Sequence, residues 1–319
     1  MTTVLSLAAQ AEGPSRVPSV VARGPRQSRS KRFKHALTGW LFIGPVMFGI
    51  LVFQLGPIVI SLFASFTNWD GLTDPQFVGA ANYAQLAIDD LFSQTLVNTI
   101  LFTVGAIPLT VGIALFLAVL LNTTNLRGKA FFRTVYFTPY VTSAVAVALV
   151  WFQLYAPEGA FNKVLAVFGI DGPAWLANST FALPAVIIVA VWQGVGYPMV
   201  ILLAGLQAIP DSIYEAALLD RARPWRTFWS VTLPLLTPQL FFVIVSQFIV
   251  SFQIFAIIFV MTNGGPGNAT NVLIYYLYQS AFEFGQLGYA SAMAWVIFVI
   301  LGIITFVQWR LQKRWVFYG

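Results

Sequence analysis

The chain has 319 residues, of which 58% are hydrophobic and only 9% are charged, and its formal net charge is +6. A water-soluble domain carries about 25% charged residues, so this composition excludes an ordinary soluble protein and indicates a chain that crosses a membrane several times. The chain has no cysteine and a single histidine, His35, which excludes disulfides and argues against a histidine-based metal or general-base site.

The first 35 residues form a basic segment rich in serine, proline, glycine and arginine, and they end in SRSKRFKH. We predict that residues 1–35 are a disordered tail on the cytoplasmic side, close to anionic lipid. The opening apolar stretch is short and no span follows it at once, so we do not interpret it as a signal peptide. Residues 36–319 are predicted to form the membrane domain.

Six apolar runs predict six transmembrane helices and therefore an all-α fold. The runs lie near residues 37–66, 92–121, 134–156, 182–208, 234–262 and 288–310. Each is longer than the roughly 20 residues that cross a bilayer, so the helices are expected to tilt or to extend past the lipid. Prolines fall within or at the ends of several runs, which predicts bent helices.

The lysines and arginines are distributed asymmetrically about these spans. All of them except Lys163 fall in the N-terminal tail, in the segments that follow spans two and four, or near the C-terminal end. Because basic loops stay in the cytoplasm, both termini are predicted to lie inside. The remaining loops are acidic and contain Asp70, Asp74, Asp89, Asp90, Glu158, Asp171 and Glu283.

The outer segment 157–181 has an apolar pattern of its own. A short surface helix is predicted by apolar residues at the i, i+3, i+4 and i+7 spacing, namely Phe161, Val164, Leu165 and Phe168. Such a helix either packs against the ends of the spans or forms part of a floor on which another protein docks. The pattern alone leaves both interpretations open.

A polar segment, residues 209–238, separates spans four and five. Ser212 and Glu215 match a capping box, which predicts that Ser212 caps the start of a helix. Ala216 and Ala217 give this helix a small apolar face. A proline seven residues further on suits the first turn of a second short helix.

This segment resembles the loop that carries the EAA motif, the cytoplasmic loop of permeases of binding-protein-dependent ABC importers. The motif has Glu-Ala-Ala, three residues, a glycine, nine residues and Ile-x-Leu-Pro, and it is matched here by Glu215, Ala216, Ala217, Val231, Leu233 and Pro234. The carbohydrate-uptake branch, with its maltose-type and glycerol-phosphate-type permeases, is resembled at Asp220, Ala222, Trp225 and Phe228. The chain also resembles this branch at Asn98 and Thr99 and at residues 159–162 and 264–268. The resemblance therefore covers most of the chain from the first span onward.

One position departs from the motif, because Arg221 stands where the family has glycine. If that position needs a left-handed backbone, arginine adopts it only with strain. Either the turn has a different shape in this chain, or Arg221 makes its own contact with a partner.

The resemblance implies a subunit of a type I ABC importer for a sugar or related polyol-type solute, in a bacterial or archaeal cytoplasmic (inner) membrane. It implies three partners: a second homologous permease, a cytoplasmic ATPase dimer that holds ATP and magnesium, and an extracytoplasmic solute-binding protein. The loop at residues 209–233 is then the coupling loop, whose Glu215 helix sits in a cleft of the ATPase. The coupling residues implied in this way are Glu215, Ala216, Ala217, Asp220, Arg221, Leu233 and Pro234.

The sequence offers polar groups, but no charges, inside the spans. It has no Gly-x-x-x-x-Gly-Lys-Ser/Thr motif, so the chain is predicted not to bind ATP itself and not to be an enzyme. The span cores contain no aspartate, glutamate, lysine, arginine or histidine, which disfavours a proton- or ion-coupled transporter. Glycines and a proline around Gln193 predict a broken helix that can line a cavity. The candidate solute path is Asn98, Gln193, Tyr197, Gln247 and Ser251, with hydrogen bonding between helices as the alternative role for each.

Two other classes of function remain open. A passive channel or facilitator for small polar solutes needs a continuous polar path and no ATPase, and it has little use for a docking helix pair. A membrane scaffold assembles a complex without moving solute. A permease for metal ions or amino acids is a variant of the main interpretation, and only the sugar-branch residues argue against it.

Overall fold

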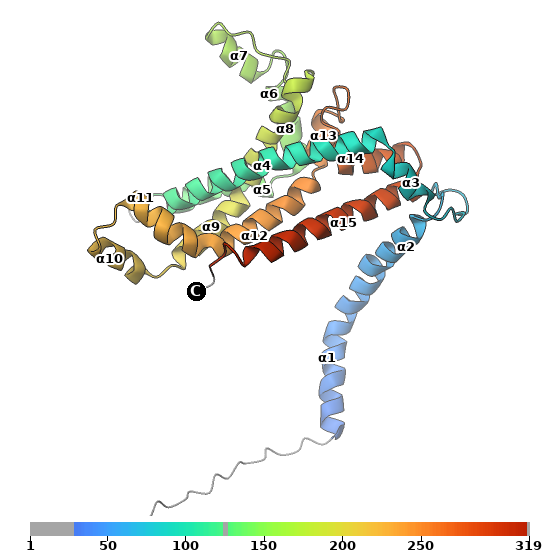
Figure 1. The fold of residues 1–319 in the computed structure, drawn as a ribbon, viewed down its shortest axis with the longest axis horizontal. Coiled ribbons are helices and arrows are strands. Elements are labelled where there is room, and N and C mark those ends of the chain that lie inside the picture. The colour runs from blue at the N-terminus through green and yellow to red at the C-terminus, as the bar shows by residue number, and fades with distance from the viewer. Residues whose placement is uncertain (1–28, 124–126, 318–319) are drawn as a thin grey trace, which may run out of the picture. The chain divides into compact units, whose positions relative to one another are not determined.

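The computed structural model describes residues 29–123 and 127–317 (Figure 1). Regular structure in these ranges is helical, and the one β contact within them is an isolated bridge between Thr67 and Phe77. The prediction of an all-α fold is therefore confirmed. Most of the predicted tail, residues 1–28, lies outside the described residues, and the first helix begins at Arg29.

The chain divides into two compact units, one ending at Pro57 and the other beginning at Ile58. The first unit consists of α1 (Arg29–Ile50), a π-helical turn (Leu51–Leu55) and the start of α2 (Gly56–Ala64). Residues Gly39–Ala64 together make a helical stretch of 26 residues that is long and apolar enough to cross a membrane. Most of its large apolar side chains are exposed, as lipid-facing side chains are.

The second unit contains the remaining helices. In chain order these are α3 (Ala81–Ala87), α4 (Asp90–Asn122), α5 (Lys129–Val141), α6 (Ala144–Leu154), α7 (Ala160–Val167), α8 (Ser179–Gly194), α9 (Gly196–Gln207), α10 (Asp211–Leu219), α11 (Pro224–Thr227), α12 (Leu233–Phe252), α13 (Ala256–Met261), α14 (Leu273–Tyr278) and α15 (Leu287–Gln312). Two π-helical turns, Phe228–Thr232 and Gln279–Glu283, follow α11 and α14 directly. The short helix α7 occupies part of the outer segment for which the apolar spacing predicts a surface helix.

Four helical stretches of the described chain are long and apolar enough to span a membrane without a sharp bend: Gly39–Ala64, Asp90–Asn122, Pro224–Met261 and Leu287–Gln312. Two helix pairs also pass this test together but are bent, α5 with α6 by 96° and α8 with α9 by 46°. If each bent pair is one span, the number of spans is up to six. The break between α8 and α9 falls at Val195, among the glycines that predict it.

The break between α5 and α6 lies inside the predicted third span, three residues after Pro139, which is one of the prolines that predict bent helices. α5 ends at Val141, and Thr142 has an extended backbone with φ −78° and ψ 145°. Thr134, Thr138 and Thr142 each donate a side-chain hydrogen bond to the carbonyl four residues earlier. Such bonds bend helices, and Pro139 removes a backbone donor from the same turn, so the chain leaves the helix there.

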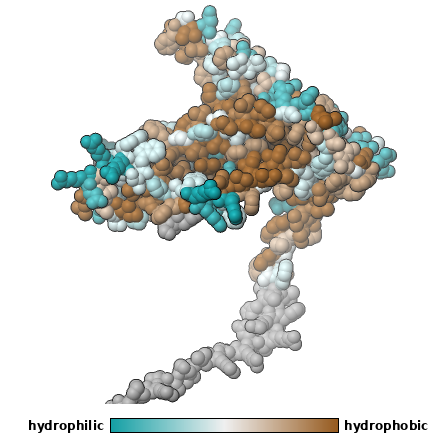
Figure 2. Space-filling model, in the orientation of Figure 1, coloured by the Kyte–Doolittle hydropathy of each residue, from teal (hydrophilic) through white to brown (hydrophobic). Residues whose placement is uncertain are grey.

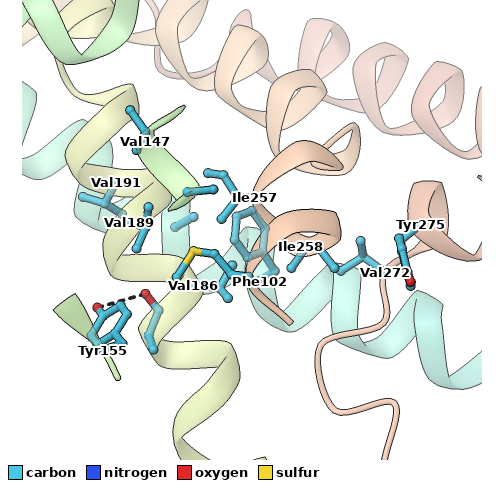
Figure 3. Packing of buried hydrophobic residues seen from close by; sticks show 14 residues of the cluster. Phe102, Val147, Tyr155, Val186, Val189, Val191, Ile257, Ile258, Val272 and Tyr275 are labelled. Carbon is cyan, nitrogen blue, oxygen red and sulfur yellow. Dashed lines mark hydrogen bonds between the residues drawn. The ribbon is translucent and has the colours of Figure 1, made fainter. Parts of the chain in front are cut away.

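α4 is the central helix of the second unit and packs against α8, α9 and α12. Figure 3 shows one of its hydrophobic clusters, in which Phe102 of α4 lies beside Ile258 of α13 and near Val186 of α8. These three side chains are almost fully buried. On the face shown in Figure 2 the surface of the bundle is largely apolar, and hydrophilic side chains gather at the end that carries α10 and α11. A charge-poor bundle of this kind is stable where lipid covers its surface.

Helices α5 and α9 approach each other closely because Gly196 has no side chain. A Cβ atom on Gly196 would lie 2.6 Å from the carbonyl oxygen of Tyr136 and 2.9 Å from the Cα atom of Phe137. Both of these are backbone atoms of α5, so they cannot move aside as a flexible side chain can. Close backbone approach through small residues is the usual way in which membrane helices pack, and it here brings the two broken helix pairs together.

Candidate functional site

The polar loop between α9 and α12 begins with α10, whose start differs from the predicted capping box. The helix begins at Asp211, its N-cap is Pro210 with φ −60° and ψ 136°, and no side chain caps it. Ser212 is therefore the second residue of the helix, not its cap, and the predicted capping box is wrong. The acidic Asp211 in the first turn favours this earlier start, because a negative charge is stabilised by the helix dipole there.

The C-terminal end of α10 is closed by a hydrogen-bonding pattern that needs a left-handed residue. The backbone N–H of Arg221 donates to the carbonyl of Leu218, and that of Ala222 donates to the carbonyl of Ala217, both at 3.0 Å. These two bonds form a Schellman motif, in which the residue after the cap is most often glycine. Arg221 occupies this position with φ +54°.

Arg221 therefore adopts a left-handed backbone, which glycine adopts without strain. This is the conformation expected if the motif glycine, whose place Arg221 takes, turns the chain in the same way. A left-handed conformation brings the Cβ atom close to the backbone and costs a residue other than glycine roughly 1–2 kcal/mol. The loop thus keeps its shape at the expense of strain at one exposed arginine.

The second half of the loop leads directly into the membrane bundle. Pro224 stands at the start of α11, as predicted, and the π-helical turn joins α11 to α12 without a gap. The hydroxyls of Tyr214 in α10 and Thr232 in this turn lie 3.3 Å apart and share a hydrogen bond. Leu233 packs against the buried cluster of α4, α9 and α12. Short contacts therefore connect α10 to the start of α12.

The predicted coupling residues lie in two groups. Glu215, Ala216, Asp220 and Arg221 are exposed on the loop, whereas Ala217, Leu233 and Pro234 are partly buried. A recess of about 350 Å³ opens between α10 and the chain that follows α11, and its lining includes Ala216, Ala217, Asp220 and Arg226. The exposed motif residues thus form a surface at the tip of the loop, whereas Leu233 and Pro234 anchor its base.

The tip of the loop also exposes large apolar side chains, one of which, Trp225, is among the residues that resemble the carbohydrate branch. Leu219 is 85% exposed and Leu218 and Trp225 are each 73% exposed. Exposed lipid-facing side chains are expected on the bundle, but this loop is polar. Its acidic and basic residues are Asp211, Glu215, Asp220, Arg221, Arg223 and Arg226. An apolar patch rimmed by charges is typical of a surface that binds another protein.

Two of the predicted solute-path residues lie together where the broken helices meet. The side-chain amide of Gln193 donates a 3.2 Å hydrogen bond to the carbonyl of Thr142, in the break between α5 and α6. The ring of Tyr197 stacks on that of Tyr140, with centroids 5.3 Å apart and planes 17° from parallel. The breaks in the two bent helix pairs are therefore joined by one hydrogen bond and one ring contact, both made by uncharged polar side chains.

The other path candidates are held differently. The amide of Asn98 donates to the carbonyls of Asn268 and Asn271 at 2.8 and 2.9 Å, so it fastens α4 to the loop between α13 and α14. Gln247 and Ser251 lie one helical turn apart on α12 and are buried. Gln247 makes no side-chain hydrogen bond in the part of the chain that the structure describes, which leaves its amide available.

Asp89 accepts four hydrogen bonds, although the sequence analysis placed it only among the acidic loop residues. One carboxylate oxygen caps α4 by accepting from the backbone N–H groups of Leu91 and Phe92 at 2.8 and 3.2 Å. The other oxygen accepts from the hydroxyls of Tyr276 and Tyr289. Burial of the carboxyl raises its pKa, but these hydrogen bonds outweigh that effect and hold the pKa of Asp89 below its ordinary value. An aspartate before a helix could have been recognised as a cap, but its tyrosine partners are too distant in sequence.

Comparisons with known proteins agree on one kind of protein. Residues 110–317 match the family model described as binding-protein-dependent transport system inner membrane component. The chain is 40% identical to the probable ABC transporter permease protein YesP of Bacillus subtilis, over 92% of this chain and 96% of that protein. It is 35% identical to the lactose transport system permease protein LacF of Rhizobium radiobacter, over 90% of this chain and 98% of that protein.

A solved structure has the same fold. It is a chain of a bacterial alginate ABC transporter, determined in complex with a periplasmic protein that carries an alginate pentasaccharide. The TM-score is 0.80, and the match covers 89% of this chain and 96% of that one. The sequence identity is 20%, so this likeness concerns the fold.

Proposed function

The chain belongs to the family of inner membrane components of binding-protein-dependent transport systems, and from that premise we propose that it is the membrane-spanning subunit of an ATP-driven importer of a sugar or related polyol-type solute. As a permease it is a transport subunit and not an enzyme. The solute class is supported by relatives named for lactose, for multiple sugars and for sn-glycerol 3-phosphate, which are 35%, 37% and 32% identical to this chain.

Six spans with both termini in the cytoplasm are the proposed topology, with each bent helix pair crossing the membrane once. The distribution of lysine and arginine supports this orientation, since Lys163 alone falls on the outer side. The membrane is the cytoplasmic (inner) membrane of a bacterium or archaeon. In this orientation α10 and α11 project into the cytoplasm, and α7 lies outside.

The observation that carries the proposal is the loop from α10 to α11, which presents an apolar, charge-rimmed tip and is packed at its base onto α12. We propose that this tip sits in a cleft of a cytoplasmic ATPase dimer, which holds the ATP and magnesium that this chain does not. Closure of the ATPase on ATP then moves α10, and the contact between Tyr214 and Thr232 passes that movement to the bundle. A second, homologous permease completes the membrane part.

The moving element in the bundle is proposed to be the junction of the two broken helix pairs. Gln193 and Tyr197 join α8 and α9 to α5 and α6 there through uncharged polar contacts. Hydroxyl-rich solutes are bound by amides and aromatic faces of this kind, without any need for charge. An inward-open and an outward-open state that differ at this junction would alternate as ATP binds and leaves, because ATP stabilises one of them more than the other.

On the outer side, a solute-binding protein is proposed to deliver the sugar. We propose that segment 157–181 forms part of the floor on which this binding protein docks. Exposed apolar side chains on and after α7, including Val167 and Phe168, support this role. Phe161, near the start of α7, packs against Trp151 and Tyr155, which supports the alternative role of packing on the span ends as well.

The experiment is isolation of the complex from native membranes through an affinity tag on this chain, followed by reconstitution into vesicles. The expected result is copurification of an ATP-hydrolysing subunit and a second permease, and uptake of a labelled sugar from a panel of mono- and disaccharides that requires both ATP and the binding protein. Uptake by the purified chain alone, without ATP, would instead identify the passive facilitator that the sequence left open.

A further inference from the structure

Arg221 is held in a backbone conformation that glycine or asparagine adopts more easily. Its φ is +54°, and the two hydrogen bonds that end α10 fix it there. A strained residue at an exposed turn is not needed for the turn itself, because glycine forms the same Schellman motif without the strain. The strain therefore points to a use for the arginine side chain.

The rest of the described chain does not use that side chain. Arg221 is exposed, and its guanidinium forms no ion pair or side-chain hydrogen bond within residues 29–123 and 127–317. The adjacent Asp220 is exposed as well and does not pair with it. Five donors in a planar fork are thus presented outward, next to the exposed Leu218 and Leu219.

The surface around Arg221 favours an acidic partner. Arg223 and Arg226 are also exposed, so residues 220–226 carry three exposed cations and one acid, Asp220, while the other two acids of the loop, Asp211 and Glu215, lie earlier on α10. A charged group at the rim of an apolar patch contributes mostly to the choice of partner and to the rate of encounter, while the apolar centre supplies much of the affinity. Arg221 has the position of such a rim group.

We propose that Arg221 is a specificity-determining contact, whose guanidinium binds a carboxylate on the ATPase partner at the edge of the cleft that receives α10. This inference rests on the proposed function and adds the residue that decides which ATPase is accepted. A carboxylate matches the fork of donors in two parallel hydrogen bonds, an arrangement that lysine cannot copy. The cost of the left-handed backbone is offset by this contact only when the partner is bound.

The test uses the complete permease pair in nanodiscs and measures its affinity for the purified ATPase over a range of salt concentrations. Arg221→Gly and Arg221→Asn both remove the charge and keep the turn, because glycine and asparagine tolerate positive φ. Arg223→Gln is the matched control, since Arg223 is an exposed cation of the same loop with an unstrained φ of −68°.

Two opposite shifts are expected from Arg221→Gly. Relief of strain raises the thermal midpoint of the permease on the order of 2 °C. Loss of the carboxylate contact weakens ATPase binding about tenfold and makes the affinity less dependent on salt. Arg221→Asn is expected to weaken binding likewise, and Arg223→Gln to change it less than about threefold.

Three outcomes overturn the inference. If the wild-type pair binds the ATPase and the Arg221→Gly pair binds it with the same affinity, the arginine makes no partner contact. A loss that occurs only in nanodiscs containing anionic lipid would assign the guanidinium to a phospholipid phosphate. Failure of the wild-type pair to bind any ATPase would instead contradict the proposed function as a whole.

Discussion

The hydroxyl of Tyr276 donates a 2.6 Å hydrogen bond to the carboxylate of Asp89, which lies 187 residues earlier in the chain. The same carboxylate accepts from Tyr289 and caps α4, so one negative charge connects α4, α14 and α15. The N-terminal ends of α4 and α15 lie near α14 in Figure 1. The charge is stabilised by four donors rather than by a cation, which is how a partly buried carboxylate can persist without a salt bridge.

Removal of this carboxylate is expected to destabilise the bundle. Asp89→Ala loses a helix cap and leaves two tyrosine hydroxyls without their acceptor, which together cost about 2–3 kcal/mol. Tyr276→Phe loses one hydrogen bond and costs about 1–1.5 kcal/mol. Thermal unfolding of the purified protein in detergent measures both. Asp90→Asn is the control, since Asp90 is exposed and next in sequence, and equal losses in Asp90→Asn and Asp89→Ala would contradict this account.

The pKa of Asp89 makes part of the stability dependent on pH. The folded-state pKa lies below the ordinary value of 3.8, so the proton binds more weakly to the folded than to the unfolded protein. The resulting stability is fully present above that ordinary value and is lost as the pH falls from it through the folded-state pKa. The unfolding midpoint of the wild type is therefore expected to fall more steeply below pH 4 than that of Asp89→Asn. Parallel curves for the two proteins would show that Asp89 does not carry this dependence.

Gly196 and Gly194 provide a matched pair for the contact between α5 and α9. Gly196→Ala places a Cβ atom 2.6 Å from a backbone oxygen of α5, and overpacking of this kind costs about 1–3 kcal/mol. Gly194→Ala meets no atom within 4 Å and is expected to be neutral or slightly stabilising. Unfolding midpoints and sugar uptake in vesicles measure the difference. Equal behaviour of the two variants would mean that the helices do not pack as described.

The polar residues of the bundle are expected to separate into two kinds. Gln193→Ala, Tyr197→Ala and Gln247→Ala are expected to raise the solute concentration at half-maximal uptake, because these groups are the proposed contacts with the sugar. Asn98→Ala is expected to lower the unfolding temperature instead, because both of its donor bonds fasten α4 to the loop at Asn268 and Asn271. Unchanged transport affinity in all three of the first variants would remove them from the solute path.

Sequence reasoning reached some features because they depend on local chemistry. The helical class follows from long apolar runs and the break at Val195 follows from its flanking glycines. Strain at Arg221 is expected if the motif glycine, whose place it takes, has a left-handed backbone, and Arg221 does have a positive φ. Each of these features depends on residues that are close together in the sequence. The same reasoning placed the start of α10 two residues too late, because it took Ser212 as the cap, whereas the helix begins at Asp211 with Pro210 as its cap.

Other features depend on residues that are far apart. Nothing next to Asp89 indicates that Tyr276 and Tyr289 will approach it, since helix packing alone brings them together. The break at Thr142 depends in part on three threonines at four-residue spacing. The sequence alone does not show that each hydroxyl donates to the carbonyl four residues earlier. Gln193 and Tyr197 make the contacts that join the two broken helix pairs. These contacts could likewise not be predicted, because they depend on the breaks in both helix pairs.

The coupling claim can be tested by mechanical disruption of the loop. Ala217 is partly buried in the recess beside α10, so Ala217→Trp is expected to fill that recess and displace the helix without affecting insertion into the membrane. Glu215→Lys reverses an exposed charge on the same helix. In vesicles that contain the complete importer, both variants are expected to hydrolyse ATP with little or no uptake. Normal uptake by Glu215→Lys would count against the loop as the coupling element.

The most direct measurement is site-specific cross-linking from the tip of the loop. The chain has no cysteine, so Ala216→Cys introduces a single reactive thiol on the exposed face of α10, and Val167→Cys places one on α7 as the control. The account predicts that a cross-linker at position 216 captures an ATP-hydrolysing subunit, that ATP changes the yield, and that position 167 captures none. A thiol at position 216 that never captures an ATPase in the assembled complex would contradict the account.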